Sequence, residues 1–211
     1  MANTNPTQDF LELDQIREGV VILKNKNIRS ILLVSSTNFA LKSSEEQNSI
    51  IYQFQGFLNS LDFPCQIVCQ SRRLNITGYL EKMKDLEDKQ TNLLLKLQTE
   101  DYREFIKNLI ESQNILIKNF FVVVPFASLQ ATGLTIPGKK EESSNFSEDT
   151  FRRAKSQLLQ RMEFVALGLR RCGLQAVPLT SAELIELYWS LYHQKSAETG
   201  YYPEIPNNLI K

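Results

Sequence analysis

Residues 19–34 read GVVILKNKNIRSILLV and contain two aliphatic runs separated by a short polar segment. The runs, 20–23 and 28–34, are rich in β-branched side chains, which favour extended backbone. A polar segment containing Asn between two such runs favours a tight reversal of the chain. We therefore expect a β-hairpin here, and the fold builds outward from it.

The segment after the hairpin predicts a helix with one buried face. Ser43 and Ser44 are followed three residues later by Glu46 and Gln47, which gives two overlapping capping-box patterns at a helix start. Apolar residues then recur at helical spacing. They are Ile50, Ile51, Phe54, Phe57, Leu58 and Leu61, and Pro64 marks the end of the helix.

The middle of the chain predicts a short strand at 65–69, a long helical region and another strand. The helical region runs from about Ile76 to Ile115, with apolar positions that include Leu94, Leu97 and Phe105, and the polar stretch 85–92 is expected to bend or break it. Residues 115–126 are dense in Val and Phe, which is typical of a strand buried on both faces in the centre of a sheet.

Residues 127–147 predict a long exposed loop, rich in Ser, Gly, Lys and Glu. A helix follows from Ser147 to a stop at Gly173. Its expected inward residues are Phe151, Ala154, Leu158, Met162, Val165 and Leu169. An edge strand at 174–179 and a short helix with a capping box at Thr180 and Glu183 complete the pattern.

This alternation predicts an α/β fold, with a mixed sheet of about five strands that starts with a β-hairpin and packs with about four helices. We expect a flexible start at 1–9, one domain at 10–195 and an extended tail at 196–211. At 211 residues the chain is long enough to bury roughly 70% of its unfolded surface without a metal or disulfide.

Charge and composition exclude several classes of protein. Lys and Arg together number 24, as do Asp and Glu, so no global field draws the chain to nucleic acid or an anionic membrane. The apolar runs are too short to span a bilayer and no secretion signal opens the chain, so we expect a cytoplasmic protein. The three cysteines have no CxxC spacing and are expected to be buried free thiols.

Catalytic motifs are absent except for an imperfect phosphate-loop pattern. Residues 133–140 read GLTIPGKK, where Lys140 replaces the Ser or Thr that coordinates Mg²⁺, and no strand leads directly into the loop. His193 is the only histidine, which leaves almost nothing for a histidine-based metal site or triad. We expect no catalytic residue, cofactor or metal.

The candidate interaction residues are Arg72, Arg73, Arg152, Arg153, Tyr201 and Tyr202. The helix at 148–171 holds six basic residues against three acidic ones, a local excess that could face nucleic acid, a partner protein or a membrane surface. A solvated helix face with cations near the carboxyl end of the dipole is the alternative.

Several separated segments together resemble a known family. They are residues 19–75, the long helical region, the strand NFFVVVPF at 119–126 and PLTSAELIELYWSLYH at 178–193. This order resembles TraC-like domains, the amino-terminal part of the VirB-four type ATPases of conjugative type IV secretion systems. The resemblance covers about residues 9–193.

The resemblance implies a role in DNA transfer through protein–protein interaction. Its expected partners are a separately encoded RecA-like ATPase motor and inner-membrane secretion components, with self-association left open. In such proteins ATP hydrolysis belongs to the motor, and no position here matches a catalytic residue of the motor. The location implied is the cytoplasm, including the inner face of the cell membrane. A nucleic-acid-binding accessory protein and a small enzyme with an unrecognised site remain alternatives.

Overall fold

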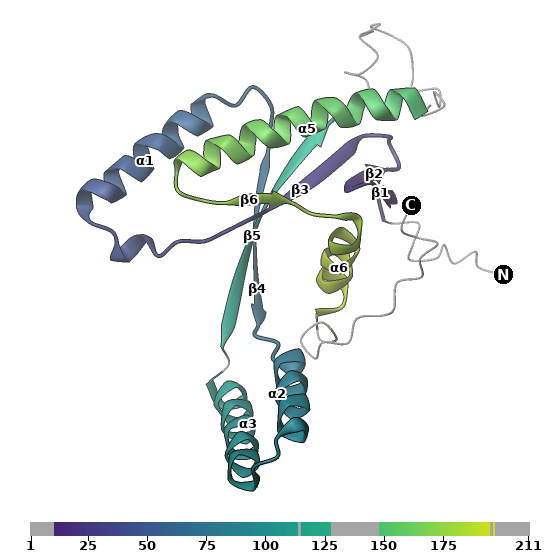
Figure 1. Ribbon diagram of the computed structural model, residues 1–211. Helices are drawn as coiled ribbons and strands as arrows, with labels where there is room; N and C mark the ends of the chain where they lie inside the picture. Colours follow the sequence, from purple (N-terminus) through teal and green to yellow (C-terminus); the bar gives the residue numbers. More distant parts are fainter. Residues whose placement is uncertain (1–10, 114, 128–147, 195, 197–211) are drawn as a thin grey trace, which may run out of the picture. The chain divides into compact units, whose positions relative to one another are not determined.

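The computed structural model describes residues 11–113, 115–127, 148–194 and 196 of the chain (Figure 1). These residues form two compact units. The first consists of the described chain up to Cys69 together with Asn119–Ile185, and the second contains Gln70–Lys118 and the described residues after Ile185. The boundary between the units cuts two strands and one helix.

The first unit opens with three antiparallel strands, β1 (Leu13–Arg17), β2 (Val20–Leu23) and β3 (Ile28–Val34). The pairing of β2 with β3 confirms the predicted hairpin, with Ile22 opposite Ile28. In the turn, Lys26 has a φ of 63° and the Asn25 side chain accepts a hydrogen bond from the Asn27 amide. β1 was not predicted, because its sequence LDQIR lacks a β-branched run.

The sheet has six strands in the order β1-β2-β3-β5-β4, with β6 (Ala176–Pro178) also paired to β3. β5 (Leu116–Phe126) pairs with β3 over seven residue pairs, from Ile28 opposite Phe126 to Val34 opposite Phe120. β3 and β5 are thus interior strands, as expected for β5.

The α/β class is confirmed, but the sheet is antiparallel, where a mixed sheet of about five strands was expected. Helix α1 (Ser44–Asn59) carries the chain from β3 to β4 (Gln66–Arg73), as the alternation of strand and helix predicts. The two strands are not neighbours, because β5 lies between them and runs antiparallel to β3. Alternation along the sequence does not reveal such an inserted strand.

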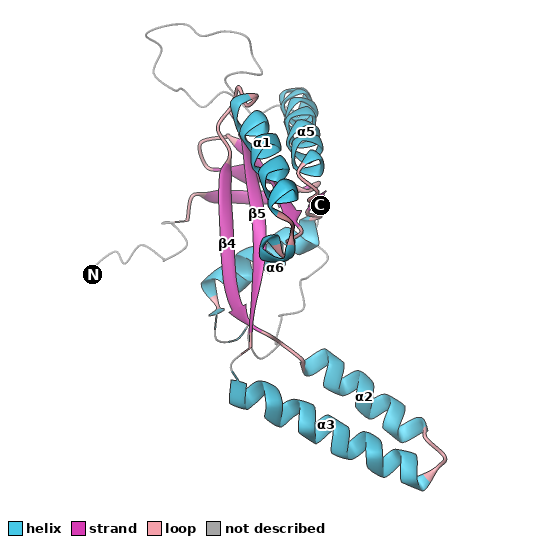
Figure 2. Ribbon diagram, turned by 90° about the vertical axis from the view of Figure 1, so that its left-hand side faces the viewer, coloured by secondary structure: helices cyan, strands magenta, loops and turns pink. Residues whose placement is uncertain are grey.

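Helices α1 and α5 (Glu148–Arg171) pack together on one face of the sheet (Figure 2). All six residues predicted to face inward on α5 are buried, and Gly173, with a φ of 80°, follows its end. On the other face of β3, Ile31 is buried as well. The main core is formed by Val20, Ile22, Ile28, Leu32, Val34, Phe57, Phe63, Val122, Val124, Phe126, Phe151, Ala154, Leu158, Met162, Val165 and Leu169.

Helix α1 begins with the predicted capping box, since the Ser43 hydroxyl accepts from the Glu46 amide and the Glu46 carboxylate accepts from the Ser43 amide. Its predicted buried face is only partly correct. Phe57 is buried, whereas Ile51 and Leu58 are exposed. At 100° per residue, these two residues lie about 80° to 100° around the helix from Ile50, on one flank of the apolar stripe.

The second unit contains a helical hairpin of α2 (Thr77–Lys89) and α3 (Leu93–Gln113) (Figure 2). The break at residues 90–92 falls within the stretch predicted to interrupt a longer helical region. At the other end of the helical hairpin, the Leu74 amide donates a hydrogen bond to the Ile115 carbonyl at 2.9 Å, which closes the base of the hairpin. Between the helices, buried Glu87 pairs with Arg103, with 3.4 Å between carboxylate and guanidinium atoms.

Helix α6 (Ser181–Tyr192) begins with the predicted capping box, since the Glu183 carboxylate accepts from the Thr180 amide at 2.7 Å. In the first unit, the Ser181 hydroxyl accepts from the Gly19 amide at 2.8 Å. The predicted loop at 128–147 and the tail at 197–211 lie outside the described residues.

Candidate interaction surfaces

The predicted interaction residues that the structure describes belong to two different units. Arg72 and Arg73 lie at the end of β4 in the second unit, whereas Arg152 and Arg153 are exposed near the start of α5 in the first. Tyr201 and Tyr202 lie outside the described residues.

Two basic side chains of α5, Lys155 and Arg161, contact other parts of the first unit. The Lys155 ammonium donates to the Glu18 carboxylate, and this hydrogen bond and charge lower the pKa of Glu18. Arg17 donates to Glu148 at 2.6 Å, which lowers the pKa of Glu148. These ion pairs join the turn after β1 to the start of α5.

Arg161, farther along α5, is also part of the packing. It donates to the Pro125 carbonyl at 3.0 Å, and its guanidinium lies over the rings of Phe63 and Phe126, at 4.9 and 4.8 Å from their centroids. The exposed pairs at 152–153 and 170–171 are about 27 Å apart along the axis, at 1.5 Å per residue. The basic residues of α5 therefore do not form one continuous patch.

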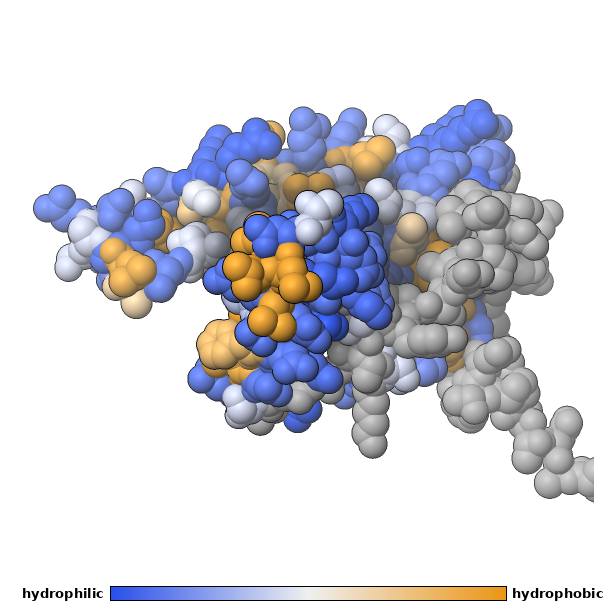
Figure 3. Space-filling view, turned by 60° about the horizontal axis from the view of Figure 1, so that its bottom comes forward, coloured by the Kyte–Doolittle hydropathy of each residue, from blue (hydrophilic) through white to orange (hydrophobic). Residues whose placement is uncertain are grey.

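The α2–α3 hairpin exposes several large apolar side chains, which Figure 3 shows as a cluster in orange. Leu94 is 76% exposed, Leu97 57% and Phe105 59%. With 100° between successive helical residues, these three side chains lie within about 80° of one another around α3. Arg103, which pairs with Glu87 of α2, lies on the opposite side of the helix. We call Leu94, Leu97 and Phe105 the hairpin stripe.

Sequence analysis identified the stripe residues as apolar positions of a helix but missed their exposure. The periodic pattern indicates which residues share a face, and it contains no information about whether another element covers that face. Leu93 and Leu95, at the same end of α3, are exposed as well.

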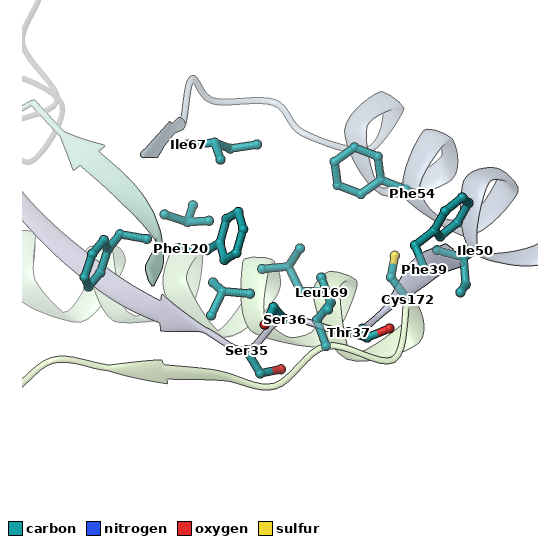
Figure 4. Close-up of a pocket in the computed structure, with 14 residues that line it drawn as sticks. Ser35, Ser36, Thr37, Phe39, Ile50, Phe54, Ile67, Phe120, Leu169 and Cys172 are labelled. Atoms are coloured by element: carbon teal, nitrogen blue, oxygen red, sulfur yellow. The ribbon is translucent and has the colours of Figure 1, made fainter. Parts of the chain in front are cut away.

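An apolar pocket of about 320 Å³ opens in the first unit (Figure 4). The sheet contributes residues such as Val34, Ile67 and Phe120, while α1 contributes Phe54 and α5 contributes Leu169. The complete lining is Val34, Ser35, Ser36, Thr37, Phe39, Ile50, Phe54, Ile67, Phe120, Phe121, Val122, Leu169, Cys172 and Leu174.

No charged residue lines this pocket, and its polar groups lie mainly at one rim. The Ser35 hydroxyl there accepts from the Gln175 amide at 2.9 Å. Cys172 contributes a buried thiol, whose Sγ lies 3.6 Å from the Gly168 carbonyl oxygen. Burial raises the pKa of this thiol, so it adds no charge to the wall at neutral pH.

All three cysteines are free, but the prediction that they are all buried was wrong. Cys172 is buried and Cys65 is half-buried, while Cys69 is exposed. Cys69 lies on β4, the last strand of the sheet order.

Among the described residues, no group of three or more His, Cys, Asp or Glu side chains is arranged to hold a metal ion. Among the helices described, none combines the length and the apolar character needed to cross a membrane. The phosphate-loop pattern at 133–140 lies outside the described residues.

Comparison with known proteins identifies one family. The family described as Archaeal TraC-like domain matches residues 15–193. No curated protein and no solved structure matches the chain significantly. The matched region includes every described strand except the first two residues of β1, together with all five α-helices of the two units. This chain therefore belongs to the archaeal TraC-like domain family.

Proposed function

We propose that the protein is a non-catalytic assembly domain of a conjugative DNA-transfer apparatus of the type IV secretion class. In this role it binds a separately encoded RecA-like ATPase motor and inner-membrane components of the apparatus. It acts in the cytoplasm, at the inner face of the membrane. Membership in a conjugation-related family supports this proposal.

The observation that carries the proposal is the exposed apolar surface of the α2–α3 hairpin. Scattered apolar side chains are normal on protein surfaces, but clustered ones mark interaction sites. Here six large hydrophobic residues of α3 are exposed, including the whole hairpin stripe. The Glu87–Arg103 ion pair lies between α2 and α3, on the side of α3 opposite the hairpin stripe.

Co-expression with the RecA-like ATPase encoded nearest in the host genome tests the proposal. We expect the full-length chain to co-elute with the motor in size-exclusion chromatography. A stable complex would bury about 1,200 to 2,000 Å². A form lacking residues 198–211 should remain folded but bind the motor more weakly, because this segment occupies the position that joins the motor in proteins of the VirB-four type.

Circular dichroism of both forms is the control for folding. If the full-length chain and the motor are each folded but elute separately, the assembly role is wrong. If the shortened form binds as tightly as the full chain, the assembly role stands and the contribution of the tail is wrong.

A further inference from the structure

The two ends of the sheet differ in how they meet solvent. β1, at one end, carries Asp14 and Arg17, and its register is irregular between Leu13 and Gln15. Charges and irregular pairing protect an edge strand from binding another strand. β4, at the other end, starts with Gln-Ile-Val-Cys at 66–69, which contains no charged residue and no proline.

The start of β4 has only one strand partner among the described residues, namely β5. A strand with one partner has backbone amide and carbonyl groups directed outward along its other side. These groups bind best to another extended backbone, whose amides and carbonyls repeat at the same spacing. The edge at 66–69 therefore favours a polypeptide over a small molecule.

The apolar pocket reaches this same edge. Ile67 belongs to β4 and lines the pocket, yet it is 59% exposed. Figure 4 shows its side chain on the opposite side of the pocket from the Ser35–Thr37 rim. An occupant of the pocket would cover Ile67 while lying beside the backbone of β4.

We propose that the motor partner docks here by strand addition: an extended segment pairs with β4 at residues 66–69 and inserts apolar side chains into the pocket. The identity of the partner rests on the function proposed above. Backbone pairing supplies the affinity, and the pocket selects the inserted residues.

The pocket defines the chemistry of the inserted segment. Its lining is uncharged, so a charged side chain would lose water without gaining an ion pair. Its volume of about 320 Å³ is roughly twice the ~150 Å³ of an apolar cavity that binds benzene. The segment should therefore carry one or two large aliphatic or aromatic residues, on alternate positions because strand side chains alternate in direction.

Ile67→Lys tests the site, because it places a charge at both the edge and the pocket. Val177→Lys is the matched control, since Val177 is also a strand residue and is also 59% exposed, but does not line the pocket. We expect Ile67→Lys to weaken motor binding at least tenfold by calorimetry, while Val177→Lys changes it less than threefold.

Amide hydrogen exchange of the wild-type complex provides the second measurement. Pairing at the edge should slow exchange of the peptide covering residues 66–69 at least tenfold when the motor is bound. Equal motor binding by Ile67→Lys and wild type, or unchanged exchange at 66–69, would overturn strand addition and leave the assembly role intact. Failure of wild type to bind the motor would count against the assembly role itself.

Discussion

At the scale of single residues, the contact between α1 and α5 depends on a glycine. A Cβ atom built on Gly168 would overlap the ring of Phe57, the buried aromatic residue of α1. The ring belongs to the main core and has little room to move. The pattern of apolar residues predicted both helices, but the need for glycine at this position depends on how closely they pack.

Gly168→Ala should therefore destabilise the protein by about 1 to 3 kcal/mol, the usual cost of overpacking a core. Gly56→Ala is the control, because no atom lies within 4 Å of its added Cβ and alanine favours the helix. Urea unfolding followed by circular dichroism measures both changes. Stability of Gly168→Ala equal to that of wild type would mean that the two helices pack less tightly than described.

A second effect at the residue scale depends on pH. The folded-state pKa values of Glu18 and Glu148 are lowered, chiefly by hydrogen bonds from Lys155 and Arg17. A lowered carboxyl pKa stabilises the fold above the unfolded value, near 4.3, and this contribution is lost as pH falls through the folded value.

We expect the double variant Glu18→Gln and Glu148→Gln to lose less stability than wild type when pH falls from 5 to 3. Thermal unfolding at several pH values measures the difference. The effect should shrink in 1 M salt, because both carboxylates are exposed and screened. Parallel pH profiles for the two proteins would show that these pairs do not contribute to acid sensitivity.

At the scale of elements, substitutions in the hairpin stripe can test the assembly role of the protein without unfolding it. Leu94 and Leu97 face away from α2, so their replacement by Lys should leave the hairpin folded. We expect the double variant Leu94→Lys and Leu97→Lys to keep the motor bound but to lose co-sedimentation with host inner membranes. Lys82→Ala together with Lys84→Ala, two exposed α2 changes, is the control.

Fractionation of host cells measures the membrane association of the stripe variant and of the control. Immunoblotting of the membrane and soluble fractions gives the distribution, and circular dichroism confirms helix content. Membrane association equal to that of wild type would remove the hairpin stripe from the assembly surface.

The elements also show which features a sequence can predict. The prediction of the inward face of α5 was correct at every position, because its apolar spacing repeats without interruption over about five turns. The hairpin at β2 and β3 was correct because the turn and both strands are local in sequence. The pocket was not predicted, since Val34, Phe54, Phe120 and Leu169 come together only through packing.

At the scale of the whole molecule, family and fold class were predicted, while the strand order was not. Separated segments in a fixed order identify a family even without a catalytic motif, and the match over residues 15–193 confirms that identification. The choice of the strand beside β3 depends on contacts between residues that are far apart in the sequence. Neither composition nor periodicity predicts those contacts.

The position of β5 beside β3 also affects how the chain folds. Ile28 pairs with Phe126, so 98 residues (126 − 28) separate the two partners. At about 5 to 20 residues per second, a ribosome needs roughly 5 to 20 seconds to supply the missing strand. During that time β3, one of the most apolar segments, has only the hairpin contact with β2. Early formation of the α2–α3 hairpin shortens the effective loop that must close, because its base brings Leu74 and Ile115 together. We therefore expect the helices that expose the hairpin stripe to shorten the time during which β3 lacks its second strand partner.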